Sequence, residues 1–130
     1  MSAKEKTTQY NIDLDWFDRK RMSFVTVATE RMCSACLEKH PPDDKGNPQK
    51  IIKMISDHCQ KDENYIHDEQ PVAESIFRVF LSNNNKPLTI ADIVEKLNQH
   101  RGASTVSPTP ETVERLLETP LFFGMGPVNN

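Results

Sequence analysis

Glycine and long apolar stretches are both scarce in this sequence of 130 residues. Only four glycines occur, and two of them fall within the last seven residues. A glycine-rich loop that holds nucleotide phosphates is therefore not expected. The chain also lacks any run of about 18 consecutive apolar residues, so we expect no membrane-spanning helix.

Net positive charge is absent as well, because 16 lysines and arginines are outnumbered by 19 aspartates and glutamates. Proteins that bind nucleic acid usually concentrate positive charge on one face. The local signatures of enzymes are missing too, since the chain has neither a nucleophile elbow nor an H-E-x-x-H motif. From these absences we expect a protein that is not an enzyme.

The first nine residues are polar and contain no apolar segment of the kind that a secretory signal requires. We expect residues 1–9 to be a disordered lead-in, and we expect the protein to be cytoplasmic. In that reducing compartment, cysteines serve as metal ligands or stay as free thiols rather than form disulfides.

All three cysteines fall in two places: Cys33 and Cys36 form a C-x-x-C pair, and Cys59 follows His58 directly. Structural zinc sites take four tetrahedral ligands from cysteine and histidine. The cysteines supply three ligands, and His58 is the preferred fourth, with His40 as the alternative from a proline-containing loop. We expect a structural Zn²⁺ site, with buried reduced thiols or, more distantly, a C-x-x-C redox protein as the alternatives.

The first half of the chain is predicted to combine strands with one helix. Apolar residues alternate over residues 10–16, which is typical of a short edge strand. Residues 23–30 are rich in β-branched and aromatic side chains and predict a second strand that runs into Cys33. Residues 49–61 predict a helix, because a set of apolar residues with helical spacing shares one face with Cys59.

The second half is predicted to be helical. The polar residues 61–70 suggest an internal boundary, so that a strand, C-x-x-C and helix module (10–69) precedes a helical module (70–130) in one compact unit. Helices are expected over residues 71–82, from Thr89 to Gly102, and after Thr109, with a capping box between Thr89 and Asp92. The predicted fold class is α+β, dominated by helices.

The segments PVAESIFRVFLS, LTIADIVEKLNQ and TPETVERLLE, followed by LFFGMGPV, resemble the winged helix-turn-helix superfamily. The resemblance covers residues 70–130 and implies that the third helix enters the major groove of DNA. That helix, however, carries one arginine and three glutamates, and residues 70–130 contain five basic and six acidic residues. Because glutamates repel a phosphate backbone, the sequence favours contact with a protein.

We therefore expect a small non-enzymatic interaction or regulatory protein, in which a zinc clip supports a surface that contacts a protein partner. The alternative is a DNA-binding regulator of transcription that uses the basic residues of the first half. Those residues are Arg19, Lys20, Arg21, Lys50 and Lys53.

Overall fold

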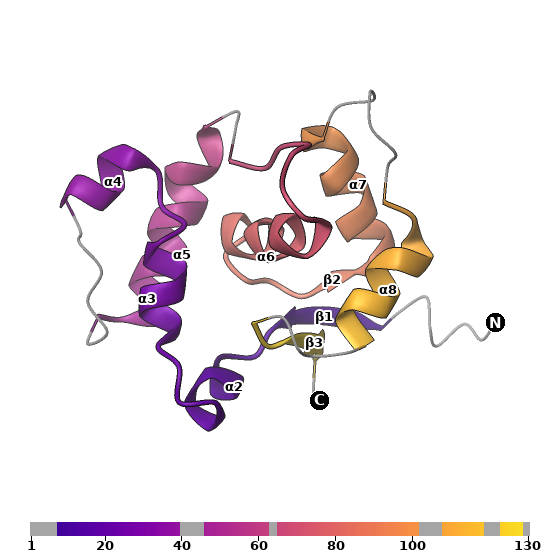
Figure 1. The fold of residues 1–130 in the computed structure, drawn as a ribbon, viewed down its shortest axis with the longest axis horizontal. Coiled ribbons are helices and arrows are strands. Elements are labelled where there is room, and N and C mark those ends of the chain that lie inside the picture. Colours follow the sequence, from indigo (N-terminus) through magenta and orange to yellow (C-terminus); the bar gives the residue numbers. More distant parts are fainter. Residues whose placement is uncertain (1–7, 40–45, 63–64, 102–107, 119–122, 129–130) are drawn as a thin grey trace.

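The computed structural model describes residues 8–39, 46–62, 65–101, 108–118 and 123–128. In these ranges the chain forms seven α-helices and a three-stranded antiparallel sheet (Figure 1), which confirms the predicted helix-dominated α+β class. None of the described helices is both long and apolar enough to cross a membrane. The elements are β1 (Gln9–Ile12), α2 (Leu14–Arg19), α3 (Phe24–Thr29), α4 (Ser34–Lys39), α5 (Pro48–Asp57), a 3-10 turn (Cys59–Lys61), α6 (Val72–Ser82), β2 (Leu88–Thr89), α7 (Ile90–His100), α8 (Pro110–Glu118) and β3 (Met125–Pro127).

The central strand of the sheet is β1, which lies between β2 and β3. Tyr10 pairs with Leu88 of β2 on one side and with Pro127 of β3 on the other. Asn85 continues the pairing beyond β2: its side-chain oxygen accepts from the Ile12 amide at 2.8 Å, and its side-chain nitrogen donates to the Ile12 carbonyl at 3.0 Å. The N-terminal strand is therefore held by segments from the second half of the chain.

The strand predicted over residues 10–16 is too long. It ends at Ile12, because the Asp13 side chain accepts a hydrogen bond from the Asp15 amide and caps α2. Tyr10 and Ile12 are buried as the alternating pattern predicts, whereas Trp16 lies on the helix and only partly in the core.

The strand predicted over residues 23–30 is wrong, because this segment forms the helix α3. Ser23 caps it by accepting a hydrogen bond from the Thr26 amide at 3.1 Å. Five of its six residues are buried, so apolar packing on several sides outweighs the preference of β-branched side chains for strands.

The helices pack in a row in which α3 contacts α5, α5 contacts α6, α6 contacts α7 and α7 contacts α8. The middle position belongs to α6 (Figure 1), and six of its eleven residues are buried. The sheet lies beside α6 and α8. The boundary predicted near residue 69 stays a prediction, although strands from both sides of it share this sheet.

Helix ends in the second half follow the predicted capping residues closely. Thr89 and Asp92 form the predicted capping box at the start of α7. Thr109 accepts from the Thr112 amide at 3.2 Å at the start of α8. The predicted end at Gly102 of the helix that begins at Thr89 lies outside the described ranges.

A charged network joins the residues before the C-x-x-C pair to α6. Glu74 accepts two hydrogen bonds from Arg31, at 2.8 and 2.9 Å, and a third from Arg78 at 2.8 Å. The Arg31 guanidinium also lies over the rings of Phe77 and Phe123 and donates to the Val27 carbonyl. The side chains of Arg31 and Glu74 are only 15% and 16% exposed, so this network fixes the chain between α3 and α4 on α6.

Replacing Glu74 with glutamine is expected to lower the free energy of unfolding by about 2 kcal/mol at pH 7, because two guanidinium groups lose a charged acceptor. Desolvation by burial acts to raise the pKa of the Glu74 carboxyl, but the hydrogen bonds from Arg31 and Arg78 outweigh it and lower the pKa below its usual value. A carboxyl whose pKa is lowered by folding stabilises the protein above the unfolded-state pKa, and this contribution is lost as the pH falls through the folded-state pKa.

The measurement is urea unfolding of wild type and Glu74→Gln between pH 7 and pH 3. We expect the difference in the free energy of unfolding between wild type and Glu74→Gln to approach zero near pH 3. The matched control is Glu118→Gln, on the exposed surface of α8. A difference that stays constant over the whole pH range would show that the charge of Glu74 is not what stabilises the fold.

Candidate metal centre

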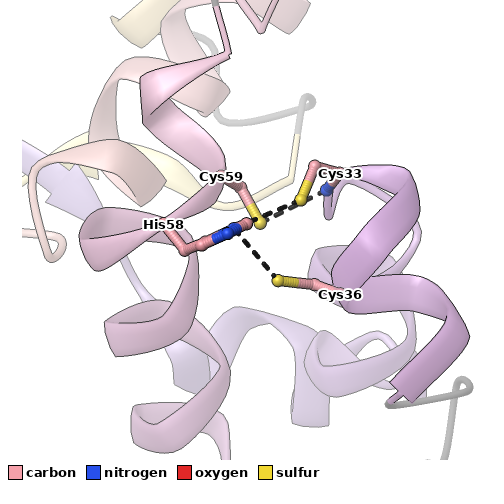
Figure 2. Close-up of side chains that lie close together, drawn as sticks. All are labelled: Cys33, Cys36, His58 and Cys59. Atoms are coloured by element: carbon pink, nitrogen blue, oxygen red, sulfur yellow. Dashed lines mark hydrogen bonds between the residues drawn. The ribbon is translucent and has the colours of Figure 1, made fainter.

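Four side chains from two distant segments converge at one point: Cys33, Cys36, His58 and Cys59 (Figure 2). Their candidate ligand atoms all lie within 4.8 Å of one another. The Nδ1 atom of His58 is 3.4 Å from the sulfur of Cys33 and 3.4 Å from the sulfur of Cys36. The structure therefore brings together the four residues that the sequence singled out as the preferred ligand set.

Cys33 and Cys36 are presented by the start of a helix rather than by the strand and turn that the sequence predicted. Cys33 directly precedes α4, and Cys36 lies in its first turn. The Cys36 backbone amide donates a hydrogen bond to the Cys33 sulfur, in the way that an amide of the first turn donates to an N-cap side chain. Both sulfurs consequently face the same side of the α4 start.

His58 and Cys59 reach the same point because α5 ends just before them. A continuous helix would separate adjacent side chains by about 100°. Here α5 ends at Asp57, and His58 leaves the helical conformation with φ −127° and ψ −59°. The 3-10 turn then begins at Cys59, whose side chain is fully buried, whereas His58 is exposed.

The distances from His58 to two of the sulfurs fit tetrahedral zinc. Zn–S bonds of about 2.3 Å and Zn–N bonds of about 2.0 Å place a sulfur and a nitrogen roughly 3.5 Å apart around one ion. The two S···N distances of 3.4 Å are close to that value. The Cys33 backbone amide also donates to the Cys59 sulfur at 3.2 Å, and such outer contacts orient the ligands of metal sites. The group is thus able to hold a metal ion, and its donor set suits zinc.

The three thiols differ in acidity because their surroundings differ. Desolvation acts to raise the pKa of Cys33, but hydrogen bonds, first from the Cys36 amide and then from Cys59, Cys36 and His58, lower it to about 7. Burial, followed by the neighbouring Cys33, raises the pKa of Cys36. Burial also raises the pKa of Cys59, to about 12. A metal that binds all three must displace protons from at least the latter two.

A metal held by all four residues would have a full set of protein ligands. Catalytic zinc sites keep one position open for water or substrate, whereas structural sites use four protein ligands. The geometry therefore suits a structural ion better than a catalytic one. The redox alternative has one supporting observation, the lowered pKa of Cys33 at the start of α4.

The basic residues of the DNA-binding alternative are not part of this cluster. His40, the alternative fourth ligand, lies outside the described residues. Arg19, Lys20 and Arg21 lie at and just beyond the end of α2, where Arg19 forms an ion pair with Asp13 at 3.2 Å.

Lys50 and Lys53 lie on the exposed side of α5, and Lys53 pairs with Asp57 at 3.1 Å. A hollow beside the cluster is lined by Lys50 and Lys53 and also by Lys39 and Met54. The sequence did not single out Lys39 or Met54. The only available signal was that Met54 flanks the apolar face predicted for residues 49–61.

Comparisons of this chain with protein-family models, with curated proteins and with solved structures gave no match. No family is assigned on that basis, and the resemblance to the winged helix-turn-helix superfamily stays a hypothesis. The metal centre is supported by the position and chemistry of its four residues alone.

Replacing His58 with asparagine is expected to abolish stoichiometric zinc binding while leaving the chain folded. His58 is exposed, so its loss opens no cavity in the core, whereas the buried Cys59 is a less suitable target. The measurement is elemental analysis of protein purified without chelators, with circular dichroism as the check of folding.

The matched control is His100→Asn, which removes an exposed histidine at the end of α7. We expect one zinc ion per chain in wild type and in the control. If His58→Asn retains as much zinc as the control, the ligand set is wrong.

Proposed function

We propose that this chain is a non-enzymatic interaction protein in which a structural zinc ion fastens α4 to the end of α5 and so shapes a surface for a protein partner. The observation that carries the proposal is the convergence of four zinc-type ligands from two segments, before α5 and at its end. A small domain gains more from such a clip than a large one, because its core buries less apolar area.

Absence of catalysis is supported by the site itself. An ion held by all four residues would have its coordination positions filled by protein side chains, which would leave none for a substrate or an activated water molecule. The chain has too few glycines for a phosphate-binding loop.

A protein partner is supported over nucleic acid by the charges on α8. In the winged-helix hypothesis this helix corresponds to the one that reads DNA. Its exposed residues include Glu111, Arg115 and Glu118, so acidic groups outnumber basic ones on the face that would meet phosphates. The packing of α6 on α7 and of α7 on α8 is compatible with that hypothesis, and we retain it as the proposed scaffold of the second half.

The nucleic-acid alternative depends on basic residues that are partly neutralised. Arg19 forms an ion pair with Asp13 at 3.2 Å, and Lys53 forms one with Asp57 at 3.1 Å. Each pair places a carboxylate beside a cation that a phosphate contact would otherwise use. They leave fewer free cations for phosphate contacts, which favours the protein partner.

Zinc-loaded protein is expected to produce no salt-dependent shift of a mixed-sequence duplex DNA in a gel assay, because acidic residues outnumber basic ones in the chain. The measurement is a titration from low to moderate salt. The control is the triple variant Arg19→Ala, Lys20→Ala, Arg21→Ala, which should behave as wild type does. Binding that weakens steeply with salt and disappears in the triple variant would establish the DNA-binding alternative instead.

A further inference from the structure

A hollow of about 430 Å³ lies between α4 and the outer side of α5, beside the metal cluster. Its α4 wall includes Ala35 and Lys39, and its α5 wall includes Lys50, Lys53 and Met54. Cys36 and His58 also border it, so two of the four ligands lie at its edge.

The two walls are joined through the ligand cluster. None of the residues of α4 is fully buried, and Cys36 and Leu37 are its partly buried contacts with the core. Cys33 and Cys36, at the start of α4, also contact the end of α5: both sulfurs lie against His58, and the Cys33 amide donates to the Cys59 sulfur (Figure 2). A metal bound by all four residues would replace weak sulfur contacts with coordinate bonds and fix the separation of the walls.

The charge of the hollow favours an acidic ligand. Three lysines line it, and Asp57 is the one acidic side chain among the described residues that do so. Zn²⁺ bound to three thiolates and a neutral imidazole carries one net negative charge, so a positive excess remains. Among the described residues Lys39 and Lys50 take part in no ion pair, which leaves both ammonium groups available.

The apolar part of the hollow favours a peptide over a nucleic acid. Ala35 and the half-buried Met54 offer a small, adaptable apolar contact. Single-stranded nucleic acids bind through aromatic side chains on which bases stack, and no aromatic residue is among the described residues that line this hollow. An aliphatic side chain flanked by carboxylates matches both the apolar floor and the lysines.

We infer that the hollow between α4 and α5 is a metal-dependent docking site for an acidic peptide segment of a partner protein. One aliphatic side chain of the peptide packs on Met54, and its carboxylates pair with Lys39 and Lys50. The inference rests on the zinc clip of the proposed function and specifies that the protein partner binds through an acidic peptide segment.

The test uses the full chain loaded with zinc and a fluorescein-labelled nonapeptide in which a central leucine is flanked on both sides by aspartates and glutamates. Binding is measured by fluorescence anisotropy at moderate salt. The matched peptide has asparagine and glutamine in place of the acidic residues, and a thymidine dodecanucleotide serves as the nucleic-acid probe. Zinc content is measured on the same samples.

We expect the acidic peptide to bind and the neutral peptide and the oligonucleotide not to compete. Lys39→Glu and Lys50→Glu should each weaken binding by about fivefold, because an attractive exposed pair becomes repulsive. Met54→Ala should weaken it by about tenfold through lost apolar contact. The control Lys86→Glu makes the same charge change at an exposed residue outside the hollow and should have no effect.

Removal of zinc should abolish peptide binding. Adding zinc back to the same sample should restore it. The inference is overturned if the acidic peptide fails to bind zinc-loaded protein. It is also overturned if the neutral peptide or the oligonucleotide binds as tightly as the acidic peptide, or if zinc-free protein binds the acidic peptide as tightly as zinc-loaded protein does. Protein that carries stoichiometric zinc yet binds no peptide refutes the docking site alone. Protein that takes up no zinc refutes the proposed function as well.

Discussion

The end of α5 at His58 is the local feature on which the metal centre depends. Because the helix stops there, two adjacent residues face one point, with Cys59 in the core and His58 at the surface. The start of α4 supplies the other two sulfurs, and the Arg31–Glu74 network holds the chain that leads to them. A shift of either segment by one residue would separate the four ligand atoms.

The rest of the molecule is stabilised in another way. β1 pairs with β2 and β3, and α6 packs between α5 and α7 through fully buried aromatic and aliphatic side chains. Apolar burial of this kind does not need a metal. The structure therefore combines an apolar core with one peripheral element, α4, which has no fully buried residue and whose attachment coordination would strengthen. In the function that we propose, that division of roles would allow a bound metal to control the hollow between α4 and α5.

Features that depend on local sequence were predictable. The capping box of Thr89 and Asp92 follows from side chains three residues apart, and the ligand set followed from C-x-x-C spacing and a nearby His-Cys pair. The helix α3 was not predictable, because its β-branched residues favour a strand until tertiary packing buries them on several sides. Nor was the pairing of Tyr10 with Leu88 and Pro127, since residues so distant in sequence meet only in the folded chain.

Amide hydrogen exchange with and without zinc tests most directly whether the metal fastens α4 to a core that stands without it. After chelation, we predict that the amides of α4 exchange at nearly the rate of a free chain, while those of α6 and α7 stay protected. Restoring zinc should return protection to α4. Protection of α4 that is unchanged by complete removal of zinc, or a loss that is equally large in α4 and α6, would contradict this account.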